Sequence, residues 1–423
     1  MSEGLAARLA ASLPDPSTAP AGLRELSNQA RRRFIELGLP GAREESWRYS
    51  SLRGLENLQP EAAPLSAEPI DAELPGVGSC LARLRAGAWQ IADSTPAGVR
   101  VRLLDVHQVS ARLVNQWLPA EADSSAAFAW LNAADARQVL LIEVDGAVEG
   151  RHSLELVHDA LGLAQCRVIV HLHAGARLSL LERWSGSAAA TGLCNIWMQV
   201  RLEEHAELDW LRLQEAGASA RSIQRSEFVL GSGTRLAHQV VELGGQWTRH
   251  DLRFAISGAL ADLKSNGVFA LSGRQHLDTQ LAIDHSVGGA ASRTLWKGVA
   301  QGRARAVFNG AIEVRPGADG TAAHLKTANL LLSPHAEIDA KPELIIEADE
   351  VQCSHGATVG RLDERALFYM RSRGLPEALA RRMLTVAFCA EALRGIEPAS
   401  LREAIEARVI AHLPELATAG VEA

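Results

Sequence analysis

The chain has 423 residues, 47% of them hydrophobic, and a formal net charge of −7, which is enough apolar material for a large core and allows two or three domains. Its only basic run is Arg31-Arg32-Arg33, and aromatic residues make up 4%, so a basic or base-stacking nucleic-acid surface is excluded. No apolar run approaches the ~18 residues that span a bilayer. We therefore expect neither a nucleic-acid nor a membrane partner.

The cysteines and the N-terminus indicate the compartment. The five cysteines are scattered, odd in number and never arranged as Cys-x-x-Cys, which is typical of a reduced, cytosolic set rather than a disulfide framework. Residues 1–5 lack the basic and apolar regions of a signal peptide. Both features predict a cytoplasmic protein.

The N-terminal region, residues 1–87, is predicted to be helical and to end in a linker. A helix is expected from Ala21, where apolar residues recur at helical spacing until Gly38 ends the run. Between Pro60 and Pro75 the composition turns to Ala, Pro and Glu, which is typical of a linker.

Residues 88–356 show short alternating apolar runs and no convincing amphipathic helix, which predicts strand after strand. A loose four-residue motif recurs and ends at Leu178, Leu208 and Leu236, spaced 30 and 28 residues apart, with a further copy ending at Ile338. Such a repeat suggests stacked coils. A sandwich of antiparallel hairpins also alternates, and Asn-Gly and Asp-Gly pairs could form its turns, so both folds stay open on pattern alone.

Residues 357–423 are predicted to form a C-terminal helical domain. Asp363 can cap a helix that stops near Gly374, Pro376 can occupy the first position of a second helix, and Pro398 can open a third. The middle helix carries a wide apolar surface. Part of that surface can dock a partner, because an exposed patch this apolar is otherwise a liability.

Most catalytic signatures are missing. The sequence contains no Gly-x-x-x-x-Gly-Lys-[Ser/Thr] loop, no His-Glu-x-x-His and no Gly-x-Ser-x-Gly. We therefore expect that the chain is not an enzyme and binds no ATP itself.

His171-Leu172-His173 is one candidate metal cluster. The two histidines share a strand face and could bind zinc or copper. Histidines in such a pattern more often line a solvated sheet face, so the pair alone does not decide between the two readings.

A second candidate is Cys353-Ser354-His355, where the β-patterned region gives way to helices. Residues i and i+2 of a strand point to one face, so Cys353 and His355 can reach one ligand, and sulfur with imidazole suits iron, copper or zinc. The alternative is a buried thiol and an edge histidine. Two ligands leave a tetrahedral metal incomplete, so a site here needs other residues, a small molecule or a second subunit.

Several stretches around this pair carry a family resemblance. These stretches are Lys341-Pro342-Glu343-Leu344, the run from Ala348 through Cys353-Ser354-His355-Gly356-Ala357-Thr358 to Gly360, Ala366 to Gly374, and Glu45-Ser46-Trp47-Arg48-Tyr49. Together they resemble the SufB/SufD family of the Suf iron–sulfur cluster assembly machinery. Within it they resemble the SufD branch, because SufB chains read Glu-His-Glu-Ala-Thr where this chain reads Ser354-His355-Gly356-Ala357-Thr358.

The resemblance implies a mainly β fold, a right-handed parallel β-helix flanked by N-terminal and C-terminal helical domains. It implies a non-catalytic scaffold that pairs with a SufB-like subunit through the β-helix and with a SufC-like ABC ATPase through the C-terminal helices. His355 then matches a histidine that works on transient iron or a nascent Fe–S cluster at the subunit interface, and Cys353 matches a thiol beside it. The family-based docking residues for the ATPase are Phe368, Tyr369, Arg371 and Arg373.

Two other functions remain under consideration. One is a homodimeric β-helix interaction protein, since an unpaired interface often self-associates when the chain is alone. The other is a polysaccharide-acting β-helix enzyme, which would need a groove with carboxylates or Ca²⁺ ligands and usually a secretory signal.

Overall fold

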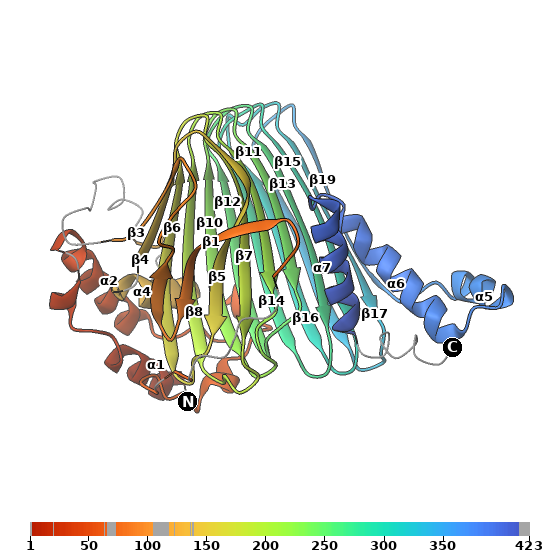
Figure 1. Ribbon diagram of the computed structural model, residues 1–423, viewed down its shortest axis with the longest axis horizontal. Coiled ribbons are helices and arrows are strands. Elements are labelled where there is room, and N and C mark those ends of the chain that lie inside the picture. The colour runs from red at the N-terminus through yellow and green to blue at the C-terminus, as the bar shows by residue number, and fades with distance from the viewer. Residues whose placement is uncertain are drawn as a thin grey trace.

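A computed structural model describes residues 2–413, apart from residues 20, 63, 66–72, 105–117, 122, 136 and 138. Its centre is a stack of strands with helices at both ends (Figure 1). The successive strands β4 to β19 alternate between two sheets, so two strands make one turn and the described residues form a solenoid of about eight turns. We refer to each such turn as a coil.

The strands fall into two sheets. Sheet A runs in the order β19-β17-β15-β13-β11-β9-β7-β5-β1-β2, with the bounds β1 Val77–Arg85, β2 Ala88–Ile91, β5 Ala147–His158, β7 Arg177–Gly186, β9 Glu207–Gln214, β11 Arg235–Glu242, β13 Asp262–Leu271, β15 Ala291–Ala300, β17 Ala322–Leu331 and β19 Gln352–Gly360. Sheet B runs in the order β18-β16-β14-β12-β10-β8-β6-β4-β3, with the bounds β3 Val99–Leu103, β4 Val139–Val144, β6 Leu163–Leu172, β8 Leu193–Leu202, β10 Arg221–Leu230, β12 Trp247–Ile256, β14 His276–His285, β16 Arg305–Val314 and β18 Glu337–Ile346.

The sequence repeat corresponds to the strand register. Leu178 pairs with Leu208 and Leu208 pairs with Leu236, all in parallel strands of sheet A. All three side chains belong to the apolar interior between the sheets. The fourth copy of the motif differs, because Ile338 lies in sheet B opposite Ala306. The parallel pairing decides for stacked coils against the antiparallel sandwich.

Two of the Asn-Gly pairs that a sandwich could have used as turns lie inside strands. Asn266-Gly267 belongs to β13 and Asn309-Gly310 to β16. The glycine at 267 leaves room for the ring of Trp296 on the next coil, since a Cβ there would lie 2.3 Å from that ring. Glycine at this position therefore serves close packing between coils and not a hairpin.

The coil interior also holds a buried ion network, which joins sheet A to sheet B. The guanidinium of Arg212 donates to Glu242 and, at 3.1 Å, to Glu182, and all three side chains are buried. Glu182 also accepts from Trp210 Nε1 at 3.0 Å and from Gln224 Nε2 at 2.8 Å. Burial alone would lower the pKa of Arg212, but the two carboxylates hold that pKa above its ordinary value.

The N-terminal helices cover the outer face of sheet B. The helical elements of this part are α1 Ser2–Ala11, η1 Pro16–Thr18, η2 Ala21–Leu23, α2 Arg24–Leu37, η3 Glu45–Trp47, η4 Leu52–Leu55, η5 Ser124–Ala126 and α4 Ala127–Ala134. All eight residues of α4 are buried, so this helix has no polar face and its sequence shows no amphipathic pattern. Apolar side chains from these helices and from the sheet form one continuous cluster, which includes Phe34, Phe128, Leu141 and Trp197.

The C-terminal helices cover the outer face of sheet A. They are α5 Glu364–Ser372, α6 Glu377–Leu393 and α7 Ala399–Ala411, and Leu213, Val241, Cys389 and Leu401 are among the side chains they bury against the sheet. In Figure 1, α7 lies along the strands and α5 projects away from them. Asp363 caps α5 through Arg365 N–H at 2.9 Å, as predicted. Pro376 precedes the first residue of α6 instead of occupying it.

The predicted fold, a parallel β-helix flanked by helices at both termini, is confirmed. Sheet A already includes β1 at 77–85, ahead of residue 88, and β19 continues to residue 360. The linker predicted between residues 60 and 75 lies partly outside the described residues. No helix in the described part of the chain is long and apolar enough to cross a membrane.

Candidate functional site at the open end of the solenoid

Cys353 and His355 lie on β19, the last strand of sheet A. Cys353 pairs with Ala323 and His355 pairs with Leu325 on β17, and both partners are buried in the apolar interior. The two residues therefore continue inward-facing rows of side chains onto the final coil. The prediction that they share one strand face agrees with this register.

The final coil is open. Cys353 is half-buried, whereas His355 and every later residue of β19 are exposed. Each of β18 and β19 has a strand neighbour on one side only, so a row of backbone N–H and C=O groups faces outward. Apolar side chains are exposed beside these edges at Ile345, Ile346 and Val359, with 52%, 44% and 44% of their surface accessible. A free edge with apolar side chains is a template for pairing with another chain.

The chemistry of the pair follows from this position. Partial burial raises the pKa of the Cys353 thiol, so it is protonated at neutral pH and becomes a strong ligand only when a metal displaces the proton. Ser354 faces the other side, where its hydroxyl lies 2.8 Å from His324 Nδ1. Among the described residues, the grouping of three potential metal ligands lies elsewhere. Cys353 and His355 thus offer two ligands, and a complete site needs more from outside.

The N-terminal motif reaches the same end of the molecule. Glu45 forms an ion pair with Lys341 on β18, which also pairs with Glu343 at 2.8 Å. Tyr49 lies near the guanidinium of Arg305 on the neighbouring strand, 5.7 Å from its ring centroid. Sequence reasoning quoted these two stretches separately and missed their contact, because 296 residues separate them.

Trp47 anchors this motif to sheet B. Its indole N–H donates to Ser125 O at 3.0 Å, and the guanidinium of Arg249 stacks 3.9 Å from its ring centroid. Arg249 in turn donates to Ser46 O at 2.8 Å and pairs with Asp251 at 2.7 Å. The motif is thus a strap that crosses the outer face of sheet B and ends near the open coil.

The four predicted ATPase-docking residues lie on or just after α5. Phe368 and Tyr369 are exposed, with 73% and 60% of their surface accessible. Arg373 lies over the Tyr369 ring at 5.2 Å, and Arg371 pairs with Glu377 at 3.2 Å in an exposed ion pair. Two neighbouring exposed aromatics on a projecting helix form an apolar patch suited to a protein partner.

Comparison with known proteins agrees with this geometry. Residues 156–388, more than half of the chain, match the family model described as "SUF system FeS cluster assembly, SufBD core domain". The chain belongs to the SufBD family. A role in Suf iron–sulfur cluster assembly follows from that membership, and Suf proteins are the expected class of partner.

Individual SufBD relatives agree over most of the length. The iron–sulfur cluster assembly protein SufD of Escherichia coli is 29% identical over 400 residues, which cover 92% of each chain. A SufBD family protein of Mycobacterium leprae is 28% identical over 88% of this chain and 90% of its own. A Synechocystis SufBD family protein is 36% identical over about half of each chain. The predicted resemblance to SufD is confirmed.

Proposed function

We propose that this SufBD protein is a non-catalytic scaffold subunit. Its open coil pairs with a SufB-like subunit, and an iron–sulfur cluster is assembled as cargo between the two. An ABC ATPase of the SufC kind docks on the C-terminal helices and supplies the ATP hydrolysis that this chain lacks. The reduced cysteine set favours the cytoplasm as its location.

The observation that carries this proposal is the position of Cys353 and His355. Two inward-facing rows of side chains that are Ala323 and Leu325 one coil earlier become a thiol and an imidazole on the coil with the free edge. Covered coils favour apolar residues there because those positions pack the core. Ligand-type residues on the uncovered coil are suited to a joint site with a second subunit.

In this proposal His355 contributes an imidazole nitrogen to incoming iron. Cys353 contributes a thiolate once iron displaces its proton, which the raised pKa of the thiol keeps in place until then. The partner supplies the remaining ligands. Iron and sulfide are substrates of the assembly and not resident cofactors of this chain.

The test is anaerobic co-expression with SufB-like and SufC-like partners, followed by iron and sulfide analysis of the purified complex. We expect His355→Ala to yield an intact complex without cluster. His335→Ala is the matched control, because His335 is also exposed but lies in the turn before β18, and it should retain the cluster.

The outcomes separate the parts of the proposal. Cluster retained in His355→Ala at the wild-type level contradicts the site. Failure of the wild-type chain to co-elute with its partners in gel filtration contradicts the scaffold role. Cys353→Ser should lower cluster content, with the complex still intact.

The docking surface has its own experiment. The double substitution Phe368→Ala/Tyr369→Ala should abolish co-elution of the ATPase and leave pairing with the SufB-like subunit unchanged, because α5 lies apart from the free strand edges. Leu260→Ser is the control, since Leu260 is an exposed apolar residue (75%) in a turn between β12 and β13. Unchanged ATPase binding in the double variant would contradict this surface.

One observation favours a second state for the isolated chain. The free edges and exposed apolar residues of the open coil can pair with a second copy when no SufB-like subunit is present. Sedimentation of the purified chain should then show a dimer, and addition of the SufB-like subunit should replace it with a heterodimer.

A further inference from the structure

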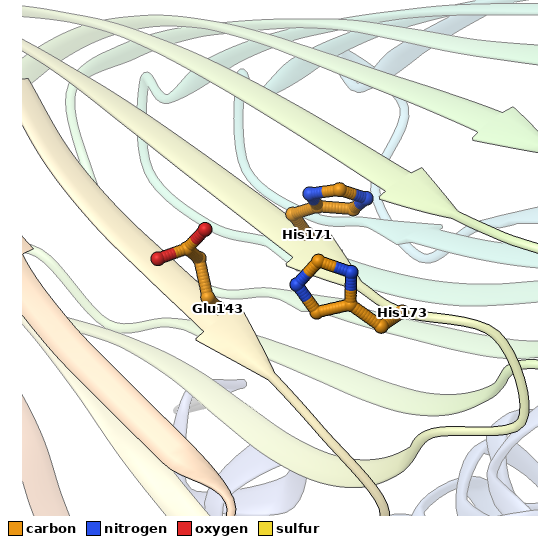
Figure 2. A group of neighbouring side chains, drawn as sticks. All are labelled: Glu143, His171 and His173. Carbon is orange, nitrogen blue, oxygen red and sulfur yellow. The ribbon is translucent and has the colours of Figure 1, made fainter. Parts of the chain in front are cut away.

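A second cluster of ligand-type side chains lies toward the opposite end of the solenoid. Glu143 is on β4, His171 is on β6 and His173 is in the turn that follows β6. Parallel pairing sets Glu143 directly opposite His171. One ligand atom from each of the three residues lies within 4.8 Å of the other two, and Figure 2 shows the three side chains turned toward a common point.

The two imidazoles are held close together. Their ring centroids are 4.3 Å apart and the rings are tilted by 44°. Glu203, just beyond β8, contacts both rings, at 3.0 Å from His171 Nε2 and 3.7 Å from His173 Nδ1. A carboxylate that fixes the ring of a histidine is the usual support behind a metal-bound imidazole.

The surrounding charges are balanced between acids and arginines. Arg102 pairs with Glu143 at 2.9 Å, and Arg100 pairs with Asp145 at 2.7 Å. Asp145 also lies 3.8 Å from His173 Nε2. The side chains of Arg100 and Arg102 are 64% and 41% exposed, so they can turn toward solvent at little cost when a cation arrives. The histidine and carboxylate side chains of the cluster are more enclosed.

We propose that Glu143, His171 and His173 bind a divalent transition-metal ion of the Zn²⁺ or Fe²⁺ type. Two imidazoles and one carboxylate are a donor set that suits these ions, whereas Mg²⁺ and Ca²⁺ prefer all-oxygen sites. Glu203 is the positioning residue that orients His171. This inference does not depend on the proposed function, because six strand spacings separate β6 from β18, about 29 Å along the solenoid.

The experiment uses the full chain, purified alone and stripped of metal. It is titrated with Co²⁺, whose visible absorption reports nitrogen and carboxylate coordination, and Zn²⁺ content is measured after equilibrium dialysis. The test variants are His171→Ala/His173→Ala, the milder His173→Asn and Glu143→Gln. His335→Ala is the matched control, and Cys353→Ser/His355→Ala is the control for the open coil.

We expect wild type, His335→Ala and Cys353→Ser/His355→Ala to bind one ion equally well. The double histidine variant should bind none at this site, and Glu143→Gln and His173→Asn should bind more weakly. Glu203→Gln should weaken binding by about 10- to 100-fold, as supporting residues do at metal sites. Urea unfolding of each variant checks that the chain still folds.

Two results would overturn the inference. The first is unchanged Co²⁺ binding in the folded His173→Asn and Glu143→Gln variants, which would make the cluster an ion-paired network only. The second is loss of binding in Cys353→Ser/His355→Ala alone, which would assign the metal to the open coil. The second result would leave the proposed function standing.

Discussion

The two ends of the solenoid are finished differently. At the first coils, β2 pairs antiparallel with β1 and β3 pairs antiparallel with β4, and the buried helix α4 packs against β6 and β8. At the last coil, β18 and β19 keep a free edge, and Ile345, Ile346 and Val359 are exposed beside it. Solenoids need covered ends, so the chain supplies one cover itself and leaves the other to a partner.

This difference separates stability from assembly. The covered coils hold the large buried side chains and the buried ion network, whereas the open coil holds exposed residues with few contacts to lose. Substitutions should therefore cost much folding energy in the covered coils and little at the open coil. Partner binding should show the reverse order.

The largest effect is expected from Arg212→Leu. The substitution leaves the carboxylates of Glu182 and Glu242 buried without their cation, so the free energy of unfolding should fall by about 3–5 kcal/mol. Urea denaturation measures it. Arg293→Leu is the control, because its pair with Asp262 at 3.1 Å is partly exposed and should cost no more than about 1 kcal/mol. Equal losses would contradict the comparison.

Trp47→Ala should come next. Trp47 is buried and packs between Arg249 and Phe128, with ring centroids 5.6 Å apart in the second contact. Its removal should lower the free energy of unfolding by about 3 kcal/mol through the lost packing. Limited proteolysis of the first 60 residues provides a second readout. A variant as stable and as resistant as wild type would show that the strap contributes nothing.

Acid should destabilise the covered coils through buried histidines. Burial lowers the pKa of His285 to about 4, while an unfolded histidine titrates near 6.5. Between these values the unfolded chain takes up a proton and the folded chain does not. Stability present above pH 6.5 is therefore lost as the pH falls, by about 2–3 kcal/mol for this group at pH 4.5.

His285→Gln removes that term. Urea unfolding at pH 7 and pH 4.5 should show a smaller acid loss in the variant than in wild type. Burial also lowers the pKa of His158, His238 and His276, so the variant still loses some stability. Equal pH dependence in the two proteins would contradict the assignment to His285.

The smallest effect on stability is expected at the open coil. Ile346→Asp replaces an exposed side chain and should change the free energy of unfolding by less than about 0.5 kcal/mol. The affinity for a SufB-like subunit should nevertheless fall at least about tenfold, because a charge is then buried at the interface. Leu260→Asp, at an equally apolar but remote turn, should change neither. Calorimetric titration decides.

Much of the fold could be predicted where the chain repeats itself. The spacing of Leu178, Leu208 and Leu236 gives the register of three coils directly, because apolar residues must stack in the interior. Alternation likewise placed Cys353 and His355 on one face. In the covered coils the period of the strands and the period of the core are the same signal.

Other features could not be predicted because they join distant parts of the chain. His171 and His173 are visible as a pair, but Glu143 lies 28 residues earlier and joins them only through parallel pairing. Glu203 looked like half of an unproductive acidic dipeptide, and the fold brings it against both rings. Helix α4 escaped notice because a helix buried on every side has no polar face.

The strap described above has a consequence for synthesis on the ribosome. Ser46 meets Arg249 203 residues later, and Glu45 meets Lys341 296 residues later. At 5–20 residues per second, the second contact waits roughly 15 to 60 seconds after Glu45 is made. The coils are added one by one during that interval, and the first residues made can fasten the last strand of sheet B only when nearly the whole solenoid exists. Closure of the strap is thus a late event that reports a completed stack.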